Sequence, residues 1–267
     1  MQAKGWVLWS WVLVVVWAGC KKSGEADSEA PATQEPPVGC ATLTTFLFES
    51  SSTYEGRAQA CNLLLSCAGG FNSILLGKGV EATLQQGAPS LSISQGLEEA
   101  HCKLTYAHVE GAPVHTLEIL DVRGGQGGIK AQLSTEALVY AKLEKEAKLS
   151  LHWRGEDLSV VALEKAELRG EAYLTGLLVL DASHNASTTL LEGTAELLVL
   201  GVRGGHHHLG GLLARQVEAV ALEGAHAVVR ASEIMRVAVA SGSSVDYNKP
   251  AKCTYADMET GAGGGCF

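Results

Sequence analysis

Three consecutive histidines, His206-His207-His208, are the residues whose type and spacing could hold a metal ion. Neutral imidazole binds zinc, copper and nickel. Successive side chains of an extended chain point to opposite faces, so at most His206 and His208 could share one ion. The triplet lies where the surrounding pattern predicts a corner, so we predict a solvated surface cluster and no metal site. His184 and His226 occupy the same place after their apolar runs, but the run between them has no histidine there, and no ladder of these two is expected.

Acid–base catalysis would need two carboxylates, or an equivalent pair, that converge at one place. Asp157, Asp181 and Asp246 belong to separate parts of the chain, and no Asp-x-Asp pair occurs. The chain also lacks a Gly-x-Ser-x-Gly nucleophile motif and a glycine-rich phosphate-binding loop. The sequence therefore predicts a protein that is not an enzyme and holds no cofactor.

The N-terminus, up to Cys20, resembles the signal peptide and lipobox of a bacterial lipoprotein. Lys4 precedes an apolar stretch, and Ala18-Gly19 supply the small residues of a cleavage site before Cys20. The stretch of about 15 apolar residues is shorter than the roughly 20 that a spanning helix needs, which argues against an uncleaved membrane anchor. The resemblance implies an exported protein that is lipidated at Cys20. Two lysines, and no Asp, follow this cysteine, which implies delivery to the outer membrane of a double-membraned host.

Six further cysteines follow, and an even number in an exported chain predicts disulfides. They are Cys40, Cys61, Cys67, Cys102, Cys253 and Cys266. The sequence leaves most of their pairing open, and the absence of a Cys-x-x-Cys pair argues against zinc. A glycine-rich segment separates Cys253 from Cys266 and is flexible enough to bring the two sulfurs together. We therefore expect Cys253 and Cys266 to pair.

The charge and aromatic content limit the partners. The formal net charge is −9, and removal of Lys4 with the signal leaves −10. Nucleic acid and anionic lipid select basic surfaces, so nucleic acid is not an expected partner. Four of the five tryptophans lie in the signal, which leaves Trp153 as the single tryptophan of the mature chain. Sugar binding by several aromatic platforms is therefore weakly supported.

Composition divides the chain into four segments. Residues 1–19 form the signal peptide, and residues 20–39 are polar and proline-rich, which predicts a flexible, disordered linker. Residues 40–67 form a cysteine-bearing extension, in which Tyr54–Leu65 has the pattern of a short helix. Residues 68–267 carry short β-branched and aliphatic runs between turn residues, which predicts an all-β domain. Its first expected strands are Asn72–Leu76, Val80–Leu84 and Leu91–Ser94.

The second half of this domain repeats one unit, a short apolar strand followed by a corner of small or polar residues. Its anchors, taken as the last apolar residue of each strand, are Leu180, Leu200, Leu222 and Ala240, at spacings of 20, 22 and 18. Such a period predicts a solenoid, in which stacked coils share a continuous core. We expect Leu180, Leu200 and Leu222 to be buried, and the corner residues Ser183, Arg203 and Ser243 to face solvent. Leu149–Leu151 looks like an earlier copy of the unit, and the alternative fold is a β-sandwich with irregular hairpins.

Over roughly residues 68–267 the chain resembles the head GIN domain family, a group of exported and mostly uncharacterised proteins that carry an adhesin label. Four features in order carry the resemblance: Phe71–Ile74 leading into Val80–Gly87, then Leu117–Ile119, the repeated strand-and-corner units, and Ala240–Tyr247 before Lys249-Pro250. The resemblance implies a right-handed, parallel β-helix-like solenoid of short strands. The chain departs from the family pattern in its histidine triplet and in its cysteines.

Together these features predict a non-enzymatic lipoprotein of the cell envelope, whose solenoid contacts protein or polysaccharide in the manner of an adhesin. Its expected partners are the membrane, through the N-terminal lipid, and an envelope polysaccharide or protein. One alternative is a purely structural envelope protein. A carbohydrate-active enzyme is another, because parallel β-helices also serve polysaccharide lyases and hydrolases.

Overall fold

The chain forms short strands joined by tight turns. The structure, a computed structural model, describes residues 53–57, 61–62, 65, 70–109, 112–123, 128–240, 242–247, 252–257 and 263–264. No helix among these residues is long and apolar enough to cross a membrane. The predicted signal peptide and linker lie outside them.

The strands are β1 (Thr53–Arg57), β2 (Ser73–Leu76), β3 (Glu81–Gln86), β4 (Ser90–Gln95), β5 (Ala100–Val109), β6 (Ala112–Asp121), β7 (Lys130–Thr135), β8 (Tyr140–Leu143), β9 (Lys148–Gly155), β10 (Leu158–Ala162), β11 (Glu167–Leu174), β12 (Leu177–Ala182), β13 (Ser187–Arg203), β14 (His206–His208), β15 (Leu212–Leu222), β16 (His226–Val229), β17 (Ala231–Val239), β18 (Ser244–Tyr247), β19 (Lys252–Asp257) and β20 (Gly263–Gly264).

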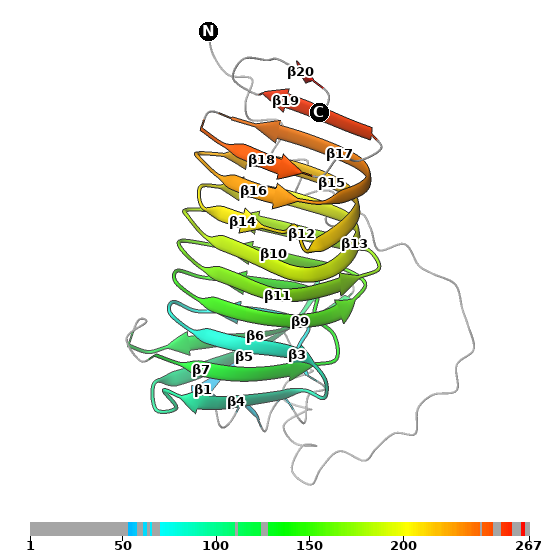
Figure 1. The fold of residues 1–267 in the computed structure, drawn as a ribbon. Coiled ribbons are helices and arrows are strands. Elements are labelled where there is room, and N and C mark those ends of the chain that lie inside the picture. Colours follow the sequence, from blue (N-terminus) through cyan, green and yellow to red (C-terminus); the bar gives the residue numbers. More distant parts are fainter. Residues whose placement is uncertain are drawn as a thin grey trace, which may run out of the picture. The chain divides into compact units, whose positions relative to one another are not determined.

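Most of these strands stack in parallel as the coils of a β-solenoid with about six turns (Figure 1). Face 1 contains, in order, β6, β2, β8, β10, β12, the later parts of β13 and β15, β17 and β19. Face 2 contains β7, β3, β9, β11, the start of β13, β14, β16 and β18. The prediction of an all-β solenoid is confirmed.

Face 3 continues face 2 around a bend, and consists of Gln85–Gln86, His152–Gly155, Glu171–Leu174, Glu192–Ala195 and Leu212–Ala214. In β11 the bend follows Gly170, where the register with β13 shifts. The φ angle of Gly170 is +135°, and a Cβ atom at this position would overlap the carbonyl oxygen of Leu151 on the neighbouring coil. Only glycine allows the coils to approach this closely while the chain turns.

The corners between face 1 and face 2 are tight turns with residues in the left-handed region. His184 and Asn185 have φ angles of 53° and 62°, and the Ala186 amide donates to the Ser183 carbonyl over 3.2 Å. Asparagine tolerates this conformation better than most residues. The corner residues Ser183, Arg203 and Ser243 are each half-buried and not fully solvent-facing. The Ser243 hydroxyl even accepts a hydrogen bond from the Gly224 amide of the preceding coil.

A ladder of inward side chains runs through face 1 and forms one side of the core. Its in-register members include Val160, Leu180, Leu200, Ala219 and Val237, all of them at most 3% exposed. Along the chain, the step from Leu180 to Leu200 is 20 residues, the step from there to Ala219 is 19, and the next step to Val237 is 18. A single coil would leave this row exposed, so burial depends on the neighbouring coils.

The structure corrects three assignments of the repeat. Leu222 is half-buried because it pairs in register with Arg203, while the adjacent Ala221 faces the core. Ala240 is half-buried as well, next to the buried Val239. Leu149–Leu151 is not an earlier copy of the same strand, because β9 stacks on β3 and β11 in face 2.

The N-terminal end of the solenoid, which we call the base, consists of β1 and β4–β7. Here β5 pairs antiparallel with both β1 and β6, and β4 pairs antiparallel with β7. The predicted short helix over Tyr54–Leu65 is wrong at its start, since Thr53–Arg57 forms β1 along the edge of β5. Cys61 and Cys102 form a disulfide with Cα atoms 6.3 Å apart, and both residues are fully buried. The cross-link therefore holds the base to the segment that precedes the first coil.

Candidate functional site

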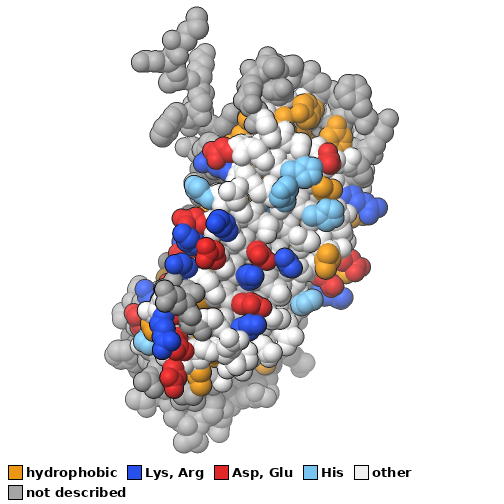
Figure 2. All heavy atoms as spheres, turned by 60° about the vertical axis from the view of Figure 1, so that its left-hand side comes forward, with side chains coloured by type: hydrophobic (Ala, Val, Ile, Leu, Met, Phe, Trp, Pro, Cys, Tyr) orange, Lys and Arg blue, Asp and Glu red, His pale blue; other side chains and the backbone are white. Residues whose placement is uncertain are grey.

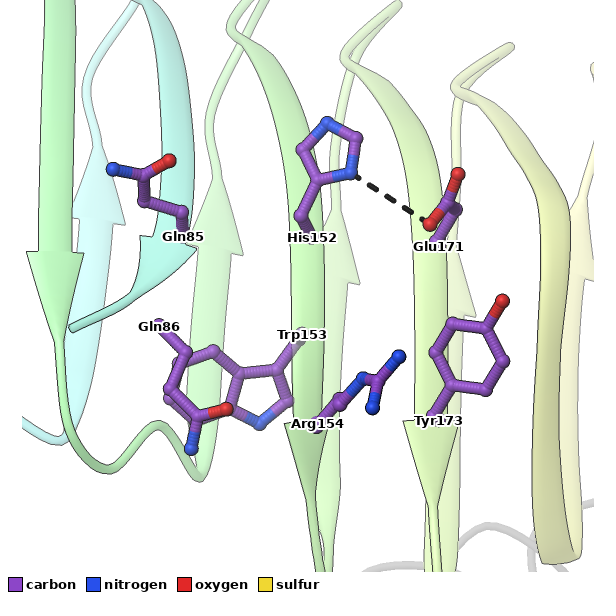
Figure 3. A pocket seen from close by; sticks show the side chains of 7 residues that line it. All are labelled: Gln85, Gln86, His152, Trp153, Arg154, Glu171 and Tyr173. Carbon is purple, nitrogen blue, oxygen red and sulfur yellow. Dashed lines mark ion pairs between the residues drawn. The ribbon is translucent and has the colours of Figure 1, made fainter.

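A hollow of about 250 Å³ lies on the side of the solenoid and is partly open to solvent (Figure 3). Its walls come from three adjacent strands: Gln85 and Gln86 from β3, His152, Trp153 and Arg154 from β9, and Glu171 and Tyr173 from β11. We call this space, together with the seven residues that line it, the hollow. All of these residues are polar or carry a polar atom, so the site offers many hydrogen-bonding groups.

The coil register arranges the side chains of the hollow in two rows. Gln85, His152 and Glu171 are in-register neighbours, and Arg154 is the in-register neighbour of Tyr173. Figure 3 shows the first three in one line across the strands, with Arg154 directed toward Tyr173. Because side chains alternate along a strand, these residues point outward while Ala172 faces the core.

A histidine–carboxylate contact and a cation–π contact organise the rim. His152 Nδ1 lies 3.9 Å from Glu171 Oε2, and the Arg154 guanidinium carbon lies 5.0 Å from the centre of the Tyr173 ring. The pKa of Tyr173 is raised, first by loss of hydration and then by a hydrogen bond to Glu192 and the nearby carboxylates. Arg154 opposes this shift of the pKa. The guanidinium and the phenol thus hold each other in place on the open side of the sheet.

Trp153 is the one inward-facing member of the hollow. Its side chain is 3% exposed, and its Nε1 atom is buried without a hydrogen-bond partner among the described residues. A Cβ atom at position 155 would lie 2.8 Å from this nitrogen, so Gly155 leaves room beside the indole N–H. A buried tryptophan usually finds an acceptor for its N–H. The indole N–H of this lining residue is therefore a buried donor with no described acceptor.

The histidine triplet forms strand β14 and not a solvated turn. His206 and His208 are exposed while His207 is 1% exposed, so the predicted alternation of faces is confirmed and the predicted solvation of all three is wrong. His207 Nε2 donates to the Gly204 carbonyl over 2.9 Å, and its Nδ1 lies 3.1 Å from Thr188 Oγ1. Burial lowers the pKa of His207, and the nearby His206 adds to this effect, against the hydrogen bond to Gly204.

Other histidines gather around this strand on face 2. His226 pairs in register with His206, with ring centres 5.9 Å apart, whereas His184 lies at a corner. As expected, His184 and His226 do not form a ladder, but the pairing of His206 with His226 was not predicted. Figure 2 shows histidines grouped on one side and, lower in the view, interleaved acidic and basic side chains. Within the described part of the chain, no three histidine, cysteine or acidic side chains are arranged to hold a metal ion.

The candidate acids are kept apart, as predicted. Asp157 follows face 3, where its Oδ1 accepts a hydrogen bond from the Leu177 amide over 2.6 Å. Asp181 lies on face 1, and burial raises its pKa while Arg203 opposes the shift. Asp246 lies on face 2, with Oδ2 3.7 Å from His226 Nε2. These three carboxylates therefore cannot act as a catalytic pair.

The predicted cysteine sites are only partly described. Besides Cys61 and Cys102, Cys253 is also disulfide-bonded. Cys20, Cys40, Cys67 and Cys266 all lie outside the described residues. Lipidation at Cys20 and the Cys253–Cys266 bond therefore stay predictions.

Fold and hollow together define a β-solenoid with a polar site on its side. A crystal structure of a putative adhesin from Bacteroides fragilis is similar, with a TM-score of 0.53 at 15% identity, over 76% of this chain and 91% of that one. A putative adhesin from Parabacteroides merdae aligns with a TM-score of 0.47 at 12% identity, over 76% and 98% of the two chains. A putative lipid binding protein from Parabacteroides distasonis aligns with a TM-score of 0.37 at 12% identity, over 76% and 94%.

At these identities the first similarity shows the fold alone. No protein-family model matches the chain, and no curated protein matches it in sequence. The resemblance to the head GIN family, carried by sequence motifs, stays a prediction.

Proposed function

We propose that this chain is an exported binding protein of the cell envelope, anchored by lipid at Cys20, whose solenoid contacts polysaccharide or protein without chemical turnover. The observation that carries the proposal is the hollow, where polar side chains from three neighbouring strands line one space. A site of this kind needs a rigid scaffold, and the parallel ladders of β3, β9 and β11 supply one.

Two further observations support binding over catalysis. Asp157, Asp181 and Asp246 lie on different parts of the coils, so they do not form the carboxylate pair of a glycoside hydrolase. The adhesin name of the Bacteroides fragilis protein, whose fold this chain shares, agrees with a binding role. The lipobox-like residues before Cys20 support export and anchoring, and the presence of lysines instead of Asp directly after Cys20 supports the outer membrane.

A binding screen tests the central part of the proposal. The mature chain with Cys20→Ser, which removes the lipidation site, is applied to a glycan array and to immobilised cell-wall and envelope-protein fractions. We expect saturable binding to at least one fraction and no release of new reducing ends or unsaturated products from the bound polysaccharide. Glu171 and Glu192 are in-register neighbours, so the turnover assay is a necessary control. Turnover would contradict the non-enzymatic proposal, and failure to bind any fraction would contradict the binding role.

The anchor is tested separately in cells. Cys20→Ser should abolish acyl labelling and membrane retention, because only a thiol at that position accepts the lipid. Ser23→Ala, shortly after the cysteine, is the matched control and should leave both unchanged. Unchanged labelling of the Cys20→Ser chain would show that the lipoprotein prediction is wrong.

A further inference from the structure

Resting on the binding role above, we infer that the hollow binds a single neutral pyranose unit of a polysaccharide. The first reason is Trp153, a lining residue of the hollow whose indole N–H is buried and has no described partner. An unsatisfied buried donor is unfavourable, so an acceptor that reached this N–H would add directly to affinity. A ring hydroxyl of a sugar is such an acceptor.

The second reason is the chemistry of the rim. Gln85 and Gln86 present amides, Arg154 a guanidinium and Glu171 a carboxylate, all planar groups around one space. Amides both donate and accept, the guanidinium only donates, and the carboxylate only accepts. Sugar hydroxyls also donate and accept, and neighbouring hydroxyls can engage both atoms of a planar group. The rim therefore matches a polyhydroxylated ligand better than an apolar one.

The charges of the hollow favour a neutral sugar over an acidic one. Arg154 is the one permanent cation among the lining residues, and it already packs on Tyr173. Glu171 belongs to the same rim, and Glu192 is the next in-register residue and bonds to Tyr173. A uronate carboxylate would face these two acids at close range, and like charges repel. The same acids offer acceptors to the hydroxyls of an uncharged sugar.

The size and place of the hollow argue against a peptide or a larger ligand. Its volume of about 250 Å³ is below the roughly 300–1,000 Å³ of pockets that enclose drug-sized molecules. Strand addition of a peptide needs an unpaired edge. Here β3, β9 and β11 each have a partner on both sides. The rim also lacks the apolar anchor pocket around which protein interfaces form hot spots.

Calorimetry on the mature Cys20→Ser chain tests this inference. The probes are neutral gluco-, galacto- and manno-configured tetrasaccharides, and oligouronates of the same length. We expect one neutral series to bind and the oligouronates to bind at least 10-fold more weakly. Trp153→Phe, which keeps an aromatic ring and removes the N–H, should weaken binding about 10-fold. Gln86→Ala, at an exposed position, should weaken binding several-fold without changing the unfolding temperature.

His152→Ala, within the hollow, should weaken binding. Its matched control is His208→Ala, at an exposed position on face 2, which should leave binding unchanged. Preferential binding of oligouronates would overturn the neutral class. Neutral binding that is unaffected by Trp153→Phe and Gln86→Ala would overturn the hollow as the site, although the binding role would stand. Binding only to a protein fraction would overturn the saccharide inference and leave the broader proposal intact, whereas no binding to any fraction would overturn both.

Discussion

The base and the coils above it are held together in different ways. From β8 to β19 each coil lies on the one before it, and the in-register neighbours come from successive coils of nearly equal length. In the base, β6 and β7 lie beyond β2 and β3, so the chain order is not the spatial order. The base uses antiparallel pairs and the Cys61–Cys102 bond where the coils use repetition.

The two regions therefore depend on different sources of stability. The coils depend on close contact with nearest neighbours, so a defect in one interface should weaken two coils directly. The base contains longer connections and an end that no further coil covers within the described residues. A covalent link there restricts the unfolded chain, which repetition cannot do. Variants that separate these two contributions would test the comparison.

The largest effect should come from the close approach of two coils. Gly170→Ala places a Cβ atom against the Leu151 carbonyl oxygen at a φ angle of +135°. We expect a loss of at least about 4 kcal/mol in the free energy of unfolding, measured by denaturant titration. Gly201→Ala is the matched control, because the nearest described atom to its Cβ would be Asp181 Oδ1 at an ordinary 3.8 Å. Equal stability of the two variants would contradict the tight coil contact.

Removal of the disulfide should act mainly on the base. Cys61 and Cys102 are 41 residues apart, and the chain-entropy estimate for such a loop is about 4 kcal/mol. We expect Cys61→Ala with Cys102→Ala to increase hydrogen exchange in β1, β5 and β6 while β11–β13 keep their protection. A uniform increase along the whole solenoid would show that base and coils unfold as one unit. Mutating both cysteines avoids a free thiol that could pair with another cysteine.

Truncation of leucines should cost more stability at inward-facing positions of the core ladder than at apolar positions that the sequence pattern wrongly placed inward. Leu180 is 1% exposed, and Leu180→Ala should cost about 3 kcal/mol, within the range of buried leucine truncations. Leu222→Ala, at a half-buried position in register with Arg203, should cost less than about 1 kcal/mol. Chemical denaturation of both variants gives the comparison. A Leu222→Ala cost as large as that of Leu180→Ala would contradict the register.

The sequence predicted the solenoid and its inward residues Leu180 and Leu200, because a strand that repeats at a nearly constant period must stack. It misplaced Leu222 because the coil after Leu200 is shorter: Leu200 pairs with Ala219, which leaves Leu222 in register with the half-buried Arg203. In that coil the core is filled by small residues, whereas Val220 is 37% exposed. In this coil, therefore, the size of an apolar residue did not predict whether its side chain faces the core.

The hollow was not predicted, although part of it could have been. His152 and Glu171, like Arg154 and Tyr173, are separated by one coil of the chain, so a known period would have aligned both pairs. Gln85 and Gln86 lie beside these pairs because β3 pairs directly with β9, although the base strands β4–β7 lie between β3 and β9 in the sequence. No local pattern reveals that arrangement. The same reason hides the pairing of Cys61 with Cys102.

The smallest effect concerns pH and His207, which is buried inside the coils. Burial lowers the pKa of His207 in the folded chain, whereas the unfolded chain has the ordinary value of about 6.5. The unfolded state therefore binds more protons below that pH, so stability should fall as the pH drops from 7 toward 5. His207→Gln should flatten this part of the stability–pH curve, whereas His208→Gln, at an exposed position of the same strand, should leave the slope unchanged. An equal slope in wild type and His207→Gln would show that the His207 imidazole does not contribute to the pH dependence of stability. Its pKa would then be the same in the folded and the unfolded chain.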